Sequence, residues 1–432
     1  MFLFFFLFFH FASSRSVTID LIRKPLTHKM KLQNPFMSNY QSNVCLGEPK
    51  QCLDFVIDPI CPYIWVTDTL SDSIMDKSKK YSLAKSNTKY FDPEERDVSY
   101  SKFTYLGYVI TEKIEFSNSP ISLEIMMLDV KKVTNADDIS GVIGLNHTDA
   151  IASLPDHLIQ REKLFTNNII TISLSHDNNN NFGKIIFGEI PLYAIGNPAN
   201  GFGYCKGTGY KCSLKYISVP KKEGEELYDI EEDVVFDLNT NKIIAPFYFM
   251  FYIESVFLKN LFYQNLCQEK ELYQYFTFVC STIDGIDKNG FTFVFETYGM
   301  KLTINNLFIK TDEGYEFVLY SDKSITYWIF GLPIFDLFEI TFDRDKHIIG
   351  FYSTMNTVQV FNGPVQPIYM EGSKKAKENK HGLTWKIISF WIMVLVFIIF
   401  LFVLFLVIRR IRRDKLKEKP IEVDYQLNEK IM

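Results

Sequence analysis

Two aspartates lie in similar sequence frames, and each one closes a short apolar run. Asp58 ends the run FVID (residues 55–58), and Asp237 ends the run VVFD (residues 234–237). Further along the chain, each frame is followed by a second apolar run that ends in glycine, at Gly144 for the first frame and at Gly331 for the second. A repeat of this size predicts two related halves. Two carboxyls that meet can share one proton, so that one acts as a base while the other acts as an acid.

The segments around these frames resemble the pepsin-like aspartic peptidases. The segment YQSNVCLGEPKQCLDFVIDPICPYIWV (residues 40–66) is similar to the opening of that family, and WIFGLPIFDLFEITFDRDKHIIGFY (residues 328–352) is similar to its last strands. The resemblance covers roughly residues 32 to 356, and several matches in the right order carry it. It implies an all-β, two-lobed pepsin-like fold with an interlobe cleft, and it places the catalytic pair at Asp58 and Asp237.

In that family both aspartates are followed by Thr-Gly, and here both pairs are replaced. Pro59-Ile60 follows Asp58, and Leu238-Asn239 follows Asp237. The resemblance implies that the threonine hydroxyls lock the two turns together and that the glycines leave room beside the carboxylates. Proline has neither a hydroxyl nor a backbone N–H, and leucine has no hydroxyl, so both locks are lost. A displacement of about 1 Å can cost on the order of a hundredfold in rate.

Other parts of the family's site are retained. The resemblance places Tyr100 at the tyrosine of the flap that covers the substrate, Trp65 behind that flap, and Thr240 beside the second aspartate. The glycines that follow the flap tyrosine in the family are absent, since Ser101-Lys102-Phe103 stands in their place. Glycine lets a flap bend over a ligand. We therefore expect this flap to open less easily.

These observations predict a pepsin-like aspartic peptidase homologue that is impaired in catalysis and binds extended peptide or protein in its cleft. Such binding can proceed by strand addition, which needs backbone groups rather than a catalytic pair. Two alternatives stay open. One is an active acid endopeptidase that uses Asp58 and Asp237. The other is a structural or adhesive ectodomain whose cleft is filled by its own Phe103, Ile60 or Leu332. The sequence names neither a substrate nor a partner.

The two ends of the chain predict secretion and a membrane anchor. Residues 1–14 are typical of a signal peptide, because an apolar run is followed by small residues. Residues 387–408 are almost wholly apolar and long enough to cross a bilayer. Residues 409–432 form a basic tail of the kind that stays on the cytosolic side. We expect a single-pass type I membrane protein of the secretory pathway, the cell surface or a lysosome-like or vacuole-like compartment.

Between these ends we expect five further parts. Residues 15–39 form an N-terminal segment similar to a short propeptide remnant, 40–190 a first lobe, 191–207 an interlobe connection, 208–356 a second lobe, and 357–386 a stalk. Alternating apolar and polar residues predict strands over 215–219 and 291–295, for example. The strongest helical patterns cover residues 150–163 and 247–261.

Six of the seven cysteines predict three local disulfides in an oxidising lumen, although other pairings stay open. The simplest set is Cys45–Cys52, Cys205–Cys212 and Cys267–Cys280. Cys61 is left over. We expect it to be a buried, inert thiol, because no histidine lies near it in sequence and the neighbouring Asp58 would raise its pKa.

Metal, cofactor and nucleic-acid binding are not predicted. The seven histidines show no ligand spacing near the cysteines, and membrane topology already explains the basic run. The net charge of −5 says little about partners, because a membrane is expected to separate the tail from the body. Asn146-His147-Thr148 is a glycosylation sequon, which predicts a modified Asn146.

Overall fold

The structure is a computed structural model, and it describes residues 16–25, 36–71, 79–87, 90–100, 103–116, 122–134, 139–147, 153–165, 167–174, 182–189, 201–221, 224–353, 358–360 and 368–369. All of these lie in the first of two compact units, residues 1–370. The predicted signal peptide, stalk, membrane span and basic tail fall outside them, apart from short pieces of the stalk. Within the described residues, no helix is long and apolar enough to cross a membrane.

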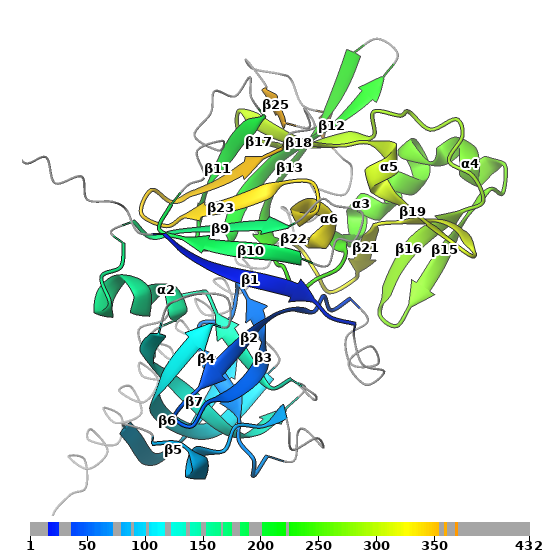
Figure 1. The fold of residues 1–432 in the computed structure, drawn as a ribbon. Coiled ribbons are helices and arrows are strands. Elements are labelled where there is room, and N and C mark those ends of the chain that lie inside the picture. The colour runs from blue at the N-terminus through cyan, green and yellow to red at the C-terminus, as the bar shows by residue number, and fades with distance from the viewer. Residues whose placement is uncertain are drawn as a thin grey trace, which may run out of the picture. The chain divides into compact units, whose positions relative to one another are not determined.

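Strands dominate both halves of this unit, as the period-two runs predicted (Figure 1). In the first half they are β1 (Val17–Arg23), β2 (Tyr40–Leu46), β3 (Gln51–Asp58), β4 (Ile64–Thr67), β5 (Tyr90–Tyr100), β6 (Phe103–Phe116), β7 (Ser122–Thr134), β8 (Gly141–Gly144), β9 (Ile169–Leu174) and β10 (Phe182–Phe187). In the second half they are β11 (Phe202–Thr208), β12 (Lys211–Lys221), β13 (Gly224–Phe236), β14 (Ile243–Pro246), β15 (Cys267–Leu272), β16 (Tyr275–Cys280), β17 (Phe291–Phe295), β18 (Tyr298–Leu302), β19 (Phe308–Thr311), β20 (Gly314–Phe317), β21 (Leu319–Asp322), β22 (Trp328–Phe330), β23 (Glu339–Asp343), β24 (Ile348–Tyr352), β25 (Val358–Val360) and β26 (Ile368–Tyr369).

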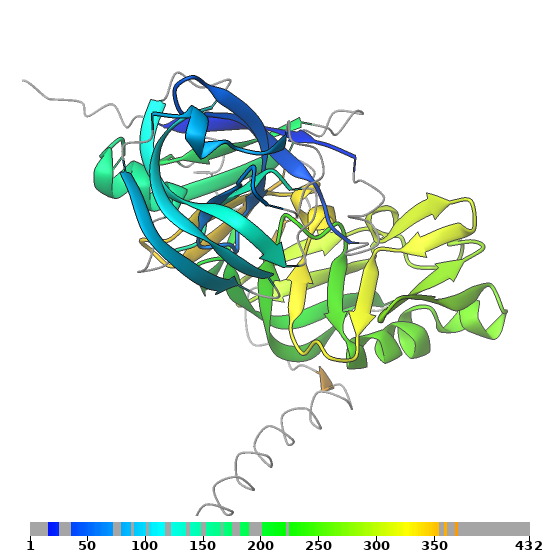
Figure 2. The ribbon, with the colours of Figure 1, turned by 90° about the horizontal axis from the view of Figure 1, so that it is seen from below.

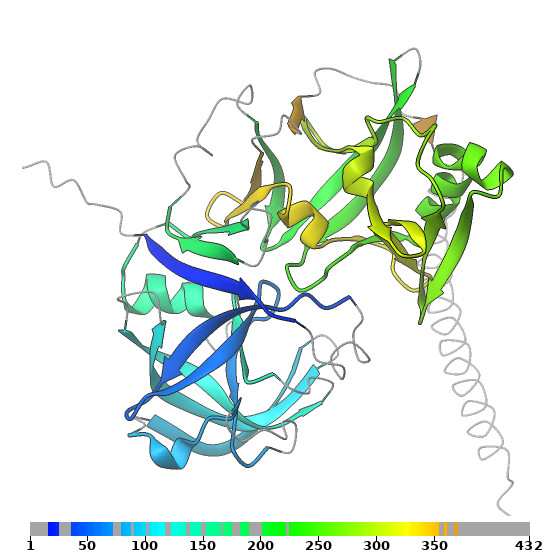
Figure 3. The same cartoon turned by 45° about the vertical axis from the view of Figure 1, so that its right-hand side comes forward.

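Helices are short in the described part of the chain. They are η2 (Leu83–Lys85), α2 (Leu154–Asp156), η3 (His157–Arg161), α3 (Phe247–Tyr252), η6 (Ile253–Phe257), α4 (Lys259–Tyr263), α5 (Ile304–Leu307) and α6 (Leu332–Phe335). Both segments with strong helical patterns do contain helix, but each is broken into shorter pieces. Figure 3 shows the green helices of the second half beside its strands.

The predicted repeat is present as one strand arrangement used twice. In the first half β3 pairs in parallel with β8, β8 pairs antiparallel with β4, and β4 pairs in parallel with β7. In the second half β13, β22, β14 and β21 repeat these pairings in the same order. Asp58 is therefore the last residue of β3, and Asp237 directly follows β13.

The glycine that ends each second run is required by the crossing of chains at this point. A Cβ atom on Gly144 would lie 2.4 Å from the carbonyl oxygen of Cys61. A Cβ atom on Gly331 would lie 2.1 Å from the carbonyl oxygen of Thr240. Cys61 and Thr240 hold equivalent places after the two aspartates, so the same close approach fixes the turn in both halves.

Strands of both halves also meet in one antiparallel sheet. Its strands follow the order β1, β10, β9, β23, β24, β11, and β9 from the first half pairs with β23 from the second (Figure 1). Thr171 and Thr341 face each other across that junction, with 2.9 Å between their hydroxyl oxygens. Residues 17–23, which were expected to belong to a short N-terminal segment, thus form β1 of this sheet.

Most apolar side chains of both halves belong to one large core. Val17, Ile19 and Leu21 alternate with exposed residues along β1, and all five residues of β17 are buried. The long strands β5, β6 and β7 pair with one another and curl together (Figure 2). Their other face forms a smaller apolar cluster around Trp65 and Tyr105, close to the first aspartate in sequence and in space.

Candidate active site

The first aspartate is held by the amides of its own turn. The Oδ1 atom of Asp58 accepts hydrogen bonds from the backbone N–H groups of Ile60 (2.9 Å) and Cys61 (3.0 Å). The carbonyl of Asp58 accepts a third from the N–H of Leu145, 3.0 Å away. Pro59, which stands in place of the family's threonine, is buried. The turn therefore keeps its carboxylate support although it has lost the locking hydroxyl.

The second aspartate has equivalent support and one additional donor. The Oδ1 atom of Asp237 accepts a hydrogen bond from the N–H of Asn239 at 2.9 Å, and Oδ2 accepts one from the Thr240 hydroxyl at 2.7 Å. Thr240 thus lies where the sequence placed it, beside the second aspartate. Leu238 is fully buried, so its side chain adds apolar packing where the family has a hydroxyl.

The two carboxyls interact electrostatically. Burial and the charge of Asp237 together raise the pKa of Asp58 to about 7, while the amides of Cys61 and Ile60 oppose the rise. Burial also raises the pKa of Asp237, against the Thr240 hydroxyl and the Asn239 amide, which lower it. Because the charge of one carboxyl disfavours ionisation of the other, the pair can hold a single proton.

The side chain of Asn239 faces the opposite aspartate, and the sequence predicted only part of its role. It was expected to crowd the site because it replaces a glycine. It also lies close enough to Asp58 to favour the ionised form, which lowers the pKa of that carboxyl, an effect smaller than those of burial and of Asp237. A carboxamide donor directed at a carboxylate occupies hydrogen-bonding capacity that a reacting water would need. The two aspartates thus differ in the donors of their own turns, and Asp58 additionally has the Asn239 side chain of the other turn beside it.

Trp65 is buried, and its aromatic partner is Tyr105. The two ring centroids are 4.9 Å apart, and both side chains are buried. Burial raises the pKa of Tyr105, and Cys61 and Asp58 raise it further, which places this tyrosine beside the first turn. Tyr100 ends β5, and its backbone is opposite Phe103. Tyr105 on β6 is directly opposite Val98 on β5, and Val98 packs against the cluster that contains Trp65. The alternation of side chains along this hairpin could therefore have identified Tyr105 as a residue that faces the cluster.

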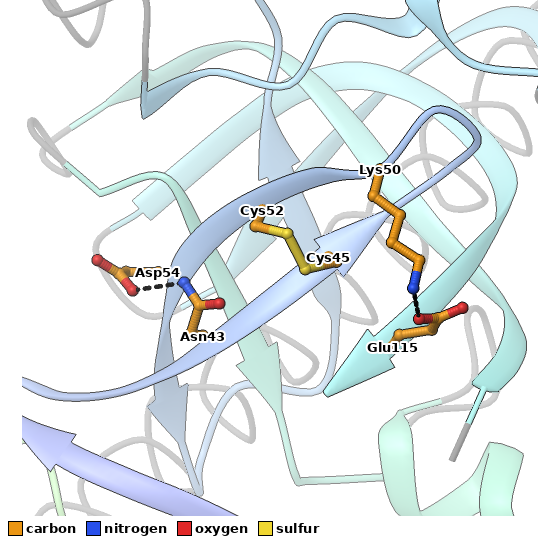
Figure 4. The surroundings of a disulfide bond; sticks show 6 residues. All are labelled: Asn43, Cys45, Lys50, Cys52, Asp54 and Glu115. Carbon is orange, nitrogen blue, oxygen red and sulfur yellow. Dashed lines mark hydrogen bonds and ion pairs between the residues drawn. A yellow bond between two sulfur atoms is a disulfide. The ribbon is translucent and has the colours of Figure 1, made fainter. Parts of the chain in front are cut away.

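Two of the three predicted disulfides are confirmed. Cys45 and Cys52 are directly opposite on β2 and β3, and the bond joins them beside the Asn43–Asp54 and Lys50–Glu115 contacts (Figure 4). Cys267 and Cys280 are directly opposite on β15 and β16 and are also bonded. In both cases the register of a hairpin brings the sulfurs together.

The third predicted disulfide, Cys205–Cys212, is wrong for this structure. Both residues are buried free thiols. The register of β11 and β12 places Cys212 opposite Gly207, two residues away from Cys205. The chain then turns Cys205 toward β24, where its thiol lies 3.7 Å from the carbonyl oxygen of Ile349. Cys205 and Cys212 are therefore not directly opposite each other, unlike the cysteines of the two bonded pairs.

Cys61 is a buried thiol, as predicted. Burial raises its pKa, and Asp58 raises it further, so the thiolate is disfavoured. Its sulfur lies 3.5 Å from the carbonyl oxygen of Tyr63. Among the residues that the structure describes, no group of three or more His, Cys, Asp or Glu side chains could hold a metal ion.

Asn146, the predicted glycosylation site, lies next to the first turn. Its side-chain amide donates a hydrogen bond to the carbonyl of Ile60 at 3.1 Å, and its backbone N–H donates to Cys61 at 3.0 Å. Glycosylation itself stays a prediction. The contacts give Asn146 a second role, since they fix the backbone that presents Ile60 and Cys61 to Asp58.

Comparison with known proteins agrees with this site. No curated protein is similar enough in sequence to match the chain. The family of eukaryotic aspartyl proteases matches residues 39–354, which include both aspartates, both glycine-ended strands and every strand except β1 of the sheet that joins the two halves. Because the match covers most of the chain, this protein belongs to the eukaryotic aspartyl protease family.

Proposed function

We propose that this family member binds an extended peptide at the two aspartate-bearing turns and hydrolyses it slowly or not at all. The observation that carries this proposal is the contact of Asn239 with Asp58. Hydrolysis by an aspartate pair needs a water activated by one carboxylate while the other carboxyl donates to the substrate. The Asn239 amide beside Asp58 competes with that water for the carboxylate. Peptide binding does not need that water, because hydrogen bonds between backbone groups can hold an extended peptide.

A slow acid endopeptidase is the second candidate, and one observation favours it. The pKa of Asp58 is raised to about 7, and the charge of Asp237 is one cause of that rise. At weakly acid pH the pair can therefore reach the singly protonated state that catalysis requires. The third candidate, a filled cleft, loses support at Leu332, which is buried in the large core with Leu238 and Phe330.

The protein acts from a membrane in this proposal. The apolar stretch 387–408 and the basic residues after it support a single-pass type I anchor, with the aspartate pair outside the cytosol. The two disulfides support the same side of the membrane, since such bonds persist in oxidising compartments. The peptide or protein that reaches the site would therefore be a secretory, surface or vacuolar one.

The test measures binding and cleavage separately in the purified full-length protein. Binding of a statine-containing peptide is followed from pH 4 to pH 7, and cleavage of a diverse peptide library is followed over the same range. We expect binding by the unmodified protein, together with cleavage at least about a hundredfold slower than in the Asn239→Ala variant. All cleavage should disappear in Asp58→Asn.

Asn43→Ala is the matched control. Asn43 is also an asparagine whose amide donates to an aspartate, Asp54 at 3.1 Å, but it lies on β2, away from both turns (Figure 4). It should leave cleavage at the level of the unmodified protein. If the unmodified protein cleaves peptides, and does so as fast as Asn239→Ala, the proposal that Asn239 impairs catalysis is refuted. The protein would then be an active acid endopeptidase. Failure of the statine peptide to bind refutes the binding proposal.

A further inference from the structure

A segment near the start of the described chain forms a short ladder with the second aspartate turn. Met37 and Thr240 form an antiparallel bridge. On one side of it the N–H of Ser38 donates to the carbonyl of Asn239 at 2.6 Å, and on the other the N–H of Asn241 donates to the carbonyl of Phe36 at 2.6 Å. Backbone from the first half of the chain thus pairs with the turn that follows Asp237.

The side chain of Ser38 adds a contact that its neighbours in the ladder cannot make. Ser38 is 2% exposed, and its hydroxyl donates a hydrogen bond to the carbonyl of Leu238. Leu238 is the residue that replaces the locking threonine. The hydroxyl that is missing from the turn itself is therefore supplied to the turn's backbone by another segment.

Phe36 anchors this segment to the second half of the chain. Its ring lies 4.6 Å, between centroids, from both Tyr275 and Tyr320. Together with Ile244 on β14, directly after the turn, these rings form a separate apolar cluster. At its other end the segment runs into β2 at Tyr40, which is fully buried. Ser38 is thus held between two fixed points, which limits how far its hydroxyl can move.

We infer that Ser38 is a positioning residue for the active site, because it holds the Leu238–Asn239 backbone so that Asn239 stays directed at Asp58. The expected effect of Ser38 on peptide binding rests on the proposed function. The effect of Ser38 on the backbone of residues 238–239 rests only on the ladder and on the hydrogen bond to Leu238. Removing the hydroxyl leaves the Leu238 carbonyl without this donor inside a buried turn, so the turn gains freedom and Asn239 loses its fixed direction.

The first measurement is hydrogen exchange of the full-length protein at the amides of residues 239–241. Ser38→Ala should exchange about fivefold faster there, the factor expected for the loss of one ordinary hydrogen bond. Ser321→Ala is the matched control, because Ser321 is also a buried serine whose hydroxyl donates to a backbone carbonyl, that of Ala245 at 2.9 Å. It should leave exchange in residues 239–241 unchanged. Ser38→Thr keeps the hydroxyl and should restore protection.

The second measurement is the pH dependence of binding of a statine-containing peptide. Ser38→Ala should shift the midpoint of that dependence, while Ser321→Ala and Ser38→Thr should not. Unchanged exchange in Ser38→Ala, or equal loss of protection in Ser38→Ala and Ser38→Thr, overturns the inference. If the peptide binds to none of the proteins, the proposed function fails, and the exchange measurement still decides the role of Ser38. If Ser38→Ala does not fold, Ser38→Cys, whose thiol is a weaker donor, takes its place, and unchanged exchange in residues 239–241 of that variant overturns the inference.

Discussion

A buried carboxyl pair away from the active site predicts that stability falls as pH rises. Asp129 on β7 is fully buried, and within the described part of the chain neither of its oxygens accepts a hydrogen bond from an N–H or hydroxyl group. Its partner is the carboxyl of Asp68, which itself accepts hydrogen bonds from the N–H of Leu70 and the hydroxyl of Thr69. Two carboxyls can hydrogen-bond each other only when one holds a proton. Asp129 is the carboxyl that has no N–H or hydroxyl donor among the described residues and whose pKa is raised, so the proton resides on Asp129.

The size of the effect follows from linkage. Burial, followed by the charge of Asp68 and the hydrogen bond with Asp68, raises the pKa of Asp129 from 3.8 to about 9, while Lys131 lowers it. Lys131 itself contacts Tyr108 and Glu95. Between pH 3.8 and about 9 the unfolded chain has released this proton while the folded chain keeps it. Stability from this group is therefore fully present below pH 3.8 and is lost as pH rises, by about 1.36 kcal/mol per unit.

The perturbation is Asp129→Asn, which is neutral at every pH and can donate to Asp68. Urea unfolding at pH 5 and pH 7 gives the free energy of unfolding of each protein. We expect the decrease between these two values to be about 2.7 kcal/mol smaller in the variant. Asp58 contributes to the decrease in both proteins, so the difference isolates Asp129. Asp97→Asn, an exposed carboxylate on β5, controls for the change in net charge. Equal decreases in the variant and the unmodified protein would refute the reasoning.

Two further predictions concern the second half of the chain. Gly331→Ala should lower the free energy of unfolding by about 3 kcal/mol, because the new methyl group would meet the carbonyl of Thr240. Gly350→Ala should cost clearly less in the same urea experiment, since the nearest atom to its methyl group belongs to a side chain; equal losses would contradict this account. Cys205 and Cys212 should be alkylated only after unfolding. A peptide that links the two in non-reducing mapping would contradict the observed free thiols.

Features that depend on local sequence were predicted well, for a physical reason. The strand-ending aspartates and the glycines at Gly144 and Gly331 recur in the same frames because a close crossing of backbones tolerates no side chain there. The two confirmed disulfides also have a local origin, since each joins directly opposite residues of a hairpin. Cys205 and Cys212 have a similar spacing, but only Gly207 and Thr208 of β11 pair with β12. The rest of β11, which includes Cys205, pairs with β24, and no local sequence pattern marks this change of partner.

Features that depend on contacts between distant segments were missed. Tyr105 meets Trp65, because the pairing of β5 with β6 decides which residues face the cluster. Asp129 lies in an apolar strand, and its pairing with Asp68 depends on the parallel alignment of β4 with β7. The Ser38 hydroxyl and the Leu238 carbonyl are 200 residues apart. Sequence alone therefore placed both aspartates but could not say what surrounds them.

The loss of the two threonines does not by itself account for the impaired catalysis that we propose. The first turn keeps two amide donors to Asp58, and Asn146 holds its backbone through Ile60. The second turn keeps its donors to Asp237, and Ser38 holds its backbone from outside. Both turns are thus supported by substitutes for the missing hydroxyls. What has no substitute is the empty space that glycine provides after the second aspartate, because Asn239 fills it with a side chain that interacts with Asp58. In the function that we propose, the block to hydrolysis therefore resides in one side chain rather than in a collapsed pair of turns.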